Sequence, residues 1–484
     1  MFMTSYMSER LEPAVLASSW LAFEPIQKRQ HLLNYPFLFR HADLVTYFRA
    51  INISRMTETY MQAKNYFARA SGLDIAGTML TGRYRDVIKD LYQSGSVPYL
   101  VLEISRENLV EDTFDQLWRR ETRELTRPLK VLLGRHEGEE GADLGGVQQE
   151  FFRLVIGQCM DPAYGAFTLD SATRMQWFVP GSVVEPWKFE MIGLLFSLAV
   201  YNGITLPVTF PVAMYRKLLK RPVEELEHIS DGWRDLYSGL ATMSHWNEEE
   251  GLVEDVFART YEFSIESMGE IISRDMRSSD FKTWPTLDSI APAFGGWGPQ
   301  ASSENPTDAP LITGATRHQY IADYVHWLTD VSVSAQYTAF ERGFKSCLHP
   351  KALSLLSPPL LQDVVEGRQT IDLVELQRIT QHVSWKKEDR SPEFFWQVVG
   401  QFDDALRQRL LEFVTASGRV PVGGMEHMRF VIQKNGEYKG GMMPRLPTAY
   451  TCYSILLLPE YESSEVMDKM LRTALAYGQG FGFA

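Results

Sequence analysis

The chain has 484 residues, of which 45% are hydrophobic, 12% aromatic and 23% charged. This is the composition of an ordinary folded protein, and the length allows several domains of roughly 100–200 residues each. The formal net charge of −13 argues against nucleic acid as a partner, because such a surface needs clustered Lys and Arg. Three cysteines, none spaced as CxxC, exclude a disulfide framework and disfavour a structural zinc site.

Neither a signal peptide nor a membrane span is predicted. The N-terminus lacks a basic segment followed by an apolar one. The longest apolar stretch begins at Met191 and is interrupted by Asn202, Gly203 and Pro207, short of the ~20 residues that a membrane span needs. We expect a buried helix there, and a protein of a reducing compartment, cytoplasmic with the nucleus as an additional location.

The first part of the chain predicts helices. Residues 1 to about 95 carry apolar and aromatic groups at helical spacing, and one helix is expected to end at Gly72. Residues 98–106 predict a strand, followed by a helix from about Asn108, and residues 129–133 predict a second strand. These elements give no indication of chemistry.

The middle and the end of the chain mix helices with strands. A helix is expected after Gly146, with Cys159 on its buried stripe. Residues 284–310 are rich in Pro, Gly and Ser and predict a long loop insertion. Gly367 interrupts a helical pattern, as a hinge or an ordinary loop would, and from Ile371 helices alternate with strands.

Cys452 lies in the segment RLPTAYTCYSILLLPEY, between a polar turn and the apolar run of residues 455–458. The prolines before it and the threonines beside it indicate a polar, partly exposed position. Two interpretations remain open from the local pattern: a reactive thiol, or a small hydrophobic residue of the interior.

A cysteine hydrolase would need a histidine within reach of the thiol. No histidine follows Cys452, and only His382 and His427, upstream, could approach it in space. A solvated surface histidine is the alternative for each, so a hydrolase is weakly supported.

Three other patterns are too incomplete to predict a metal-binding or phosphate-binding site. Cys347 and His349 offer too few ligands for a metal, and Gly145–Gly146 lacks the Lys-Ser/Thr of a phosphate loop. One acidic loop lacks the alternating spacing of an EF-hand and is expected to be solvated; its residues are Glu137, Glu139, Glu140 and Asp143. We therefore predict no metal and no organic cofactor.

Seven segments, taken together and in order, resemble the HECT-type ubiquitin ligases, and among them the branch typified by the E6-associated protein. They are RPLKVLLGRHEGEEGADLGGVQQEFF, FPVAMYRKLL, PLITGATRHQYIADYV, AFERGF, IDLVEL, LLEFVTASGRVPVGG, and RLPTAYTCYSILLLPEY with the ending GFGFA. Each alone is weak, but their common order is specific. The resemblance covers roughly Tyr99 to Ala484.

The resemblance implies an α+β fold with two lobes. It places a mainly helical N-terminal lobe at 99–367, containing a subdomain for the conjugating enzyme at about 228–315, and a smaller α/β C-terminal lobe at 371–484. Residues 1–98 would be a helical extension. A flexible hinge would join the lobes, formed by Gly367, Arg368, Gln369 and Thr370.

The resemblance also implies a mechanism without cofactor. Cys452 would accept ubiquitin from a conjugating enzyme as a thioester and pass it to a lysine of a protein substrate. A thiol that accepts the end of a large protein must stand at an accessible loop, and exchange between thiols needs no hydrolase histidine. Thr451 or loop amides would stabilise the oxyanion, and Phe481 would pack the tail across the C-terminal lobe.

The groove for the conjugating enzyme would include Leu240 and Met243 on one helix and Tyr320 and Tyr324 on another. The two tyrosines are four residues apart and share one helical face. Packing inside the subdomain is an equally good interpretation for any one of the four.

Two features depart from the family pattern. Tyr450 stands where the family usually has a histidine, and the insertion at about 284–310 falls in the subdomain for the conjugating enzyme. These departures keep an alternative open: a catalytically weak or inactive scaffold that binds ubiquitin or a conjugating enzyme.

Overall fold

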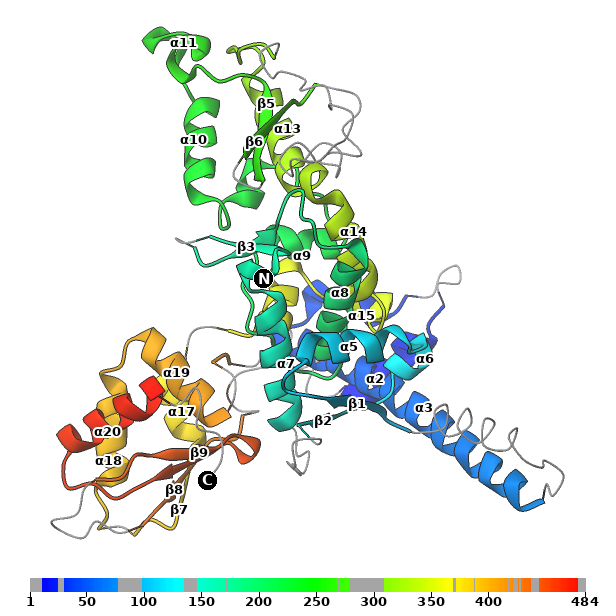
Figure 1. Ribbon diagram of the computed structural model, residues 1–484, viewed down its shortest axis with the longest axis vertical. Helices are drawn as coiled ribbons and strands as arrows, with labels where there is room; N and C mark the ends of the chain where they lie inside the picture. The colour runs from blue at the N-terminus through cyan, green and yellow to red at the C-terminus, as the bar shows by residue number, and fades with distance from the viewer. Residues whose placement is uncertain are drawn as a thin grey trace.

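Figure 1 shows the computed structural model of the chain. The structure describes residues 11–24, 30–76, 98–134, 146–170, 173–267, 270–277, 309–368, 371–386, 388–415, 418–420, 425, 428–436 and 444–477. These residues form two lobes of mixed α and β structure, as predicted.

Two helices near the N-terminus belong to the core of the N-terminal lobe. They are α2 (Pro13–Ala22) and the 36-residue α3 (His41–Ala76), joined through the 3-10 turns η1 (Leu32–Asn34) and η2 (Pro36–Leu38). Their buried side chains lie in the same hydrophobic cluster as those of residues 100–365. The described part of the predicted extension is therefore packed into the lobe. Helix α3 also continues past Gly72, where we expected it to end, because one glycine costs a helix only about 1 kcal/mol.

Lys351 attaches α2 to the lobe. Its ammonium group donates hydrogen bonds to the carbonyl oxygens of Trp20 and Leu21, at 3.0 and 2.9 Å. The last carbonyls of a helix lack partners within the helix and carry partial negative charge. A lysine from a distant part of the chain thus fixes the end of α2.

The N-terminal lobe is mainly helical, with two small sheets. Strand β1 (Leu100–Ile104) pairs in parallel with β2 (Leu129–Leu133), and β3 (Phe167–Leu169) pairs antiparallel with β4 (Gln176–Phe178). The helices and the one 3-10 turn between them are α5 (Leu109–Trp118), α6 (Thr122–Leu125), α7 (Gly146–Cys159), η4 (Pro162–Tyr164), α8 (Pro186–Tyr201), α9 (Val212–Leu218), α14 (Ser334–Phe344), α15 (Pro350–Leu353) and α16 (Pro358–Glu366).

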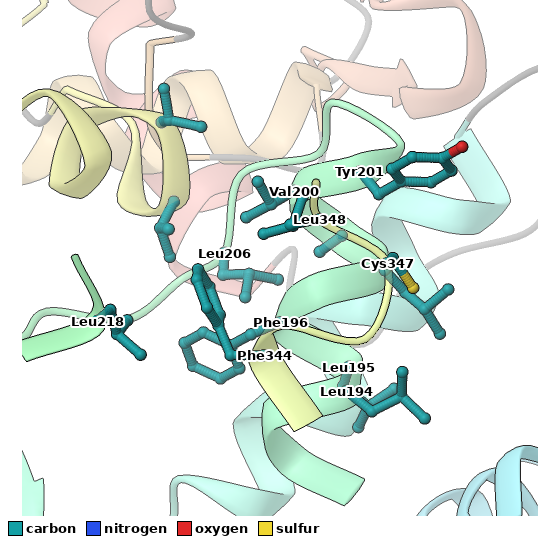
Figure 2. Close-up of a cluster of buried hydrophobic side chains, with 14 of the residues drawn as sticks. Leu194, Leu195, Phe196, Val200, Tyr201, Leu206, Leu218, Phe344, Cys347 and Leu348 are labelled. Atoms are coloured by element: carbon teal, nitrogen blue, oxygen red, sulfur yellow. The ribbon is translucent and has the colours of Figure 1, made fainter. Parts of the chain in front are cut away.

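Helix α8 is the centre of this core. Every residue from Met191 to Tyr201 is buried, which confirms the predicted buried helix, since a helix apolar on all sides belongs in an interior. Among the described residues, no helix is long and apolar enough to cross a membrane. Figure 2 shows part of the core, where side chains of α8 meet residues at and after the end of α14; it includes Leu194, Phe196, Val200, Phe344, Cys347 and Leu348.

A subdomain with its own hydrophobic cluster extends from this lobe, at the top of Figure 1. Its β5–β6 hairpin is antiparallel. Its elements are η5 (Leu226–Ile229), α10 (Arg234–Ser244), η6 (Glu248–Glu250), α11 (Val253–Phe257), β5 (Glu262–Ser267), β6 (Glu270–Asp275), α13 (Arg317–Thr329) and η10 (Val331–Val333).

The C-terminal lobe has a four-stranded sheet packed with helices. The strand order is β7-β8-β10-β9; β8 runs parallel to β7 and to β10, and β9 runs antiparallel to β10. A separate hydrophobic cluster fills this lobe. The elements are α17 (Leu373–Ile379), β7 (Gln381–Val383), α18 (Ser391–Gly400), α19 (Asp404–Thr415), β8 (Val431–Lys434), β9 (Thr448–Tyr450), β10 (Ile455–Leu458) and α20 (Ser464–Tyr477).

Candidate active site

Cys452 lies in a one-turn 3-10 helix, η12 (Thr451–Tyr453), at the tight reversal between β9 and β10. Ser454 completes the reversal with a left-handed backbone at φ +53°, a conformation that costs a residue with a Cβ roughly 1–2 kcal/mol. Its amide donates to the carbonyl oxygen of Thr451 at 3.2 Å, and its carbonyl oxygen accepts from the amide of Val431 on β8 at 3.0 Å. Hydrogen bonding to the sheet therefore fixes the backbone that follows the cysteine in the chain.

Strand β10 anchors this loop in the core. Leu456 and Leu458 are fully buried, whereas Ile455 and Leu457 on the other face are half-buried. On the loop side, Tyr450 is 53% exposed and Tyr453 46% exposed. The structure describes the backbone of Cys452 and not its side chain, but its neighbours place that backbone between a fixed strand and solvent.

The N-terminal lobe faces this loop. The segment η12 lies against α7, and Arg153 of α7 pairs with Glu412 of α19 at 3.5 Å. A cleft of about 440 Å³ between the lobes reaches Ser454, and its lining includes Arg153, Arg409, Arg419 and Arg429. Among its described lining residues, Glu412 is the one carboxylate. The cleft beside the cysteine loop is thus positive, although the whole chain is acidic.

The other two cysteines are unsuited to nucleophilic chemistry. Cys159 and Cys347 are buried, and this burial raises the pKa of each thiol to about 12. Since the thiolate is the reactive form, both belong to the core, as predicted for Cys159. His349 instead caps α15, where its Nδ1 accepts from the amide of Lys351 at 3.1 Å, and no group of described residues could hold a metal ion.

The geometry argues against a hydrolase that uses His382. That residue lies on β7, and the order of the sheet places β8 and β10 between β7 and β9. The loop of Cys452 joins β9 to β10, so His382 on β7 is at least two strand spacings from it, or about 10 Å at about 4.8 Å per spacing. The second candidate, His427, lies outside the described residues, as does the acidic loop from Glu137 to Asp143.

The four residues expected to form the groove for the conjugating enzyme lie in the subdomain core. Leu240, Met243 and Tyr320 are at most 2% exposed, and Tyr324 is half-buried. The rings of Tyr320 and Tyr324 pack at 5.7 Å between centroids. The structure therefore brings the four together and buries three of them in the hydrophobic cluster of the subdomain.

The predicted hinge begins where helix α16 ends. Gly367 has φ +71°, and a Cβ there would lie 3.0 Å from both the Cβ of Arg419 and the carbonyl oxygen of Val420. Arg368 forms an isolated bridge with Val420. Gln369 and Thr370 lie outside the described residues, as does Phe481.

Sequence reasoning missed Glu366, the residue before this glycine. Its carboxylate is buried and accepts hydrogen bonds from the phenol of Tyr215 at 2.7 Å and the amide of Phe210 at 2.8 Å. Arg419 of the C-terminal lobe lies 3.6 Å from the same carboxylate. The available signal was an acidic residue at the end of an apolar helix, directly before the glycine.

Comparison with known proteins shows the family of the chain. Residues 153–484 match the family model described as HECT-domain (ubiquitin-transferase). The chain is similar to the probable E3 ubiquitin-protein ligase HECTD2 of Homo sapiens, with 33% identity over 397 residues, which cover 80% of this chain and 47% of that protein. It therefore spans about half the length of this relative.

Two further relatives are also named as E3 ubiquitin-protein ligases. The probable E3 ubiquitin-protein ligase HERC3 of Homo sapiens is 30% identical over 395 residues, covering 80% of this chain and 33% of that protein. The E3 ubiquitin-protein ligase TOM1-like of Neurospora crassa is 28% identical over 401 residues, covering 80% of this chain and 9% of that protein. The matched part of the chain includes the cysteine loop, the predicted hinge glycine, the C-terminal lobe and the N-terminal lobe from residue 153 onward, and this chain belongs to the HECT-domain (ubiquitin-transferase) family.

Proposed function

We propose that this chain is a HECT-type ubiquitin ligase that carries ubiquitin as a thioester on Cys452 and transfers it to a substrate lysine. The observation that carries the proposal is the position of Cys452, on a tight loop between exposed tyrosines, anchored by a buried strand and facing the other lobe. The other two cysteines are buried in cores. Within the matched family region, Cys452 is thus the thiol suited to a protein-sized acyl group.

The two transfer steps change no oxidation state, so the reaction needs neither an oxidant nor a cofactor. The Cys452 thiolate attacks the carbonyl carbon of the thioester on the conjugating enzyme, and the thiolate of that enzyme leaves. A substrate lysine, as the neutral amine, then attacks the new thioester. Its nitrogen gives a proton to a carboxylate base as the amide bond forms, and the Cys452 thiolate leaves. Thr451 or loop amides would stabilise each oxyanion. Phe481, from outside the described residues, would hold the tail across the lobe.

The partners follow from the same proposal. They are ubiquitin, a conjugating enzyme and protein substrates, and nucleic acid has no role in this chemistry. The subdomain would receive the conjugating enzyme, with Tyr324 as the one member of the predicted groove that is partly exposed. We also propose a cytoplasmic and nuclear location. Placement in the branch of the E6-associated protein stays a prediction, since the relatives compared above have other names.

A single-turnover assay tests the proposal. A conjugating enzyme charged with ubiquitin is mixed with the wild-type chain and resolved without reductant. We expect an adduct that reductant removes, no adduct with Cys452→Ala, and an adduct resistant to reductant with Cys452→Ser. Cys347→Ala is the matched control and should keep the adduct, because that thiol is buried in the core.

The alternative is a scaffold that binds ubiquitin or the conjugating enzyme without transfer. Tyr450, in place of the usual histidine, is the observation that favours it, since its exposed ring stands two residues before Cys452. Binding of the conjugating enzyme without an adduct, across a broad panel of such enzymes, would support the scaffold and contradict the ligase. Tyr450→His would then test whether this residue is the cause.

A further inference from the structure

A buried carboxylate marks the last position of the N-terminal lobe before the hinge glycine. Glu366 ends α16, and its side chain is 4% exposed. One carboxylate oxygen accepts from the amide of Phe210 and from the phenol of Tyr215. Burial raises the pKa of Glu366 to about 7, while Phe210, Tyr215, Arg419 and Gln362 act in the opposite direction. The charged form of Glu366 is therefore stabilised by these partners against the cost of burial.

Arg419 reaches this carboxylate from the other lobe. One guanidinium nitrogen lies 3.6 Å from Glu366, and another donates to the carbonyl oxygen of Val208 at 2.8 Å and to the hydroxyl of Thr209 at 2.7 Å. Its side chain is 15% exposed. Two hydrogen-bond acceptors and one carboxylate of the N-terminal lobe therefore lie around one arginine of the C-terminal lobe.

The backbone reinforces this contact beside the hinge. The amide of Arg368 donates to the carbonyl oxygen of Val420 at 2.8 Å, and the amide of Val420 donates back at 2.9 Å. Gly367 passes close to Arg419 with its positive φ, where a Cβ would be crowded. The start of the predicted hinge is thus joined to the C-terminal lobe within two residues of the pair Glu366–Arg419.

Separation of the lobes would disrupt this contact as a unit. Breaking a buried ion pair leaves a charge in a place that was built for its partner, which is strongly unfavourable. Arg419 also lines the same cleft as Ser454, next to the cysteine loop. The contact of Arg419 with the N-terminal lobe and the loop of Cys452 thus border the same cleft.

The docked arrangement keeps the C-terminal lobe away from the subdomain to which the proposed function assigns the conjugating enzyme. Figure 1 shows the subdomain at one end of the long axis and the C-terminal lobe at the other. A swing of the C-terminal lobe toward the subdomain requires release of Arg419. Return of Arg419 to Glu366 would bring the loaded loop back to the cleft beside α7.

We propose that Arg419, held by Glu366, is a positioning residue that favours the arrangement for lysine transfer and opposes the arrangement for loading. This inference rests on the proposed function. It predicts that loss of the contact changes the two half-reactions in opposite directions: loading of Cys452 becomes faster, and discharge of the thioester to lysine becomes slower. A residue that only stabilised the fold would lower both rates.

The kinetic experiment measures the two steps separately on the full chain. Arg419→Ala should raise the loading rate and lower the discharge rate, each by at least about threefold, as expected when one of two arrangements loses its preference. Glu366→Gln keeps the size and the acceptor for Phe210, and it is compared with the wild type at pH 8, where the Glu366 carboxylate is ionised. It should act in the same directions and covers the case in which Arg419→Ala does not fold. Arg419→Lys should restore part of the discharge rate.

Arg378→Ala is the matched control. Arg378 is an exposed arginine of the same lobe that pairs with Glu375 on its own helix, so both half-reactions should stay at the wild-type rate. If Arg419→Ala and Glu366→Gln shift both steps in one direction, or shift neither step, the positioning role is wrong.

A measurement of lobe position separates this inference from the proposed function, because it needs no ubiquitin. Spin labels are attached to Ser238→Cys on α10 and Lys469→Cys on α20, both exposed positions, in a Cys452→Ala background. The distance distribution should be narrow with Arg419 present and should broaden with Arg419→Ala. An unchanged distribution would contradict the positioning contact even if the chain forms ubiquitin adducts. If the chain forms no adducts and the distribution still broadens, the ligase proposal fails while the contact stands.

Discussion

Glu366 is a residue whose protonation should be visible in the stability of the whole chain. Its pKa is raised by burial to about 7, from 4.5 for an ordinary glutamate. Between these pH values the folded protein keeps a proton that the unfolded chain releases. The contribution of this group to the free energy of unfolding is therefore complete below about pH 4.5 and is lost as the pH rises through 7.

Glu366→Gln removes this titration and gives a testable difference. The free energy of unfolding of the wild type, minus that of Glu366→Gln, should fall between pH 4.5 and 7.5 by an amount on the order of 2–3 kcal/mol. Urea denaturation at several pH values measures it. Parallel curves for the two proteins would mean that Glu366 keeps an ordinary pKa in the folded state.

At the scale of elements, α8 and α14 pack closely against each other in the N-terminal lobe. Gly343 of α14 lies so close to α8 that a Cβ would be 1.9 Å from the carbonyl oxygen of Glu190. Gly193 of α8 faces α14 in the same way, since a Cβ there would be 2.0 Å from the carbonyl oxygen of Phe340. The helices can touch only because both positions lack a side chain.

Gly343→Ala should therefore destabilise the N-terminal lobe. Contact with backbone atoms leaves no flexible neighbour to move, so we expect a loss of about 1–3 kcal/mol in the free energy of unfolding, typical of overpacked cores. Gly157→Ala on α7 is the matched control, because a Cβ there meets no atom within 4 Å. It should be neutral or stabilising by up to about 1 kcal/mol. Equal effects in chemical denaturation would contradict the close approach.

At the scale of the whole molecule, the two lobes have separate interiors. The C-terminal lobe has a hydrophobic cluster made of residues from Ile371 to Leu475, whereas the cluster of the N-terminal lobe begins at Leu16 and ends at Val365. Helices α2 and α3, which precede residue 98, contribute side chains to the cluster of the N-terminal lobe. A cut at the predicted hinge leaves both interiors intact, but a cut at residue 98 divides the interior of the N-terminal lobe.

Two fragments test this difference. Residues 368–484 should fold alone, with dispersed amide signals and a cooperative thermal transition. Residues 99–367 should not, because the surface that α2 and α3 cover would be exposed, and they should regain structure when residues 1–98 are restored. A cooperative transition for residues 99–367 would show that α2 and α3 are dispensable.

Much of the local structure could be predicted from the pattern of the sequence. The expected strand at 129–133 is β2 as observed, and the expected helix after Gly146 is α7. The apolar run from Met191 is buried, because a helix without a polar face is stable only when all of its sides are shielded from water. The order of motifs was enough to identify the family, since it depends on residue identity and not on contacts.

The tertiary structure alone decided how the separated pieces meet. Leu240, Met243 and Tyr320 have the apolar side chains that both a groove and a core require, and only the packing of α10 on α13 placed them inside. Glu366 and Arg419 are 53 positions apart in the sequence, and no local pattern connects them. Their contact depends on the relative position of the two lobes, which arises from long-range packing around the hinge.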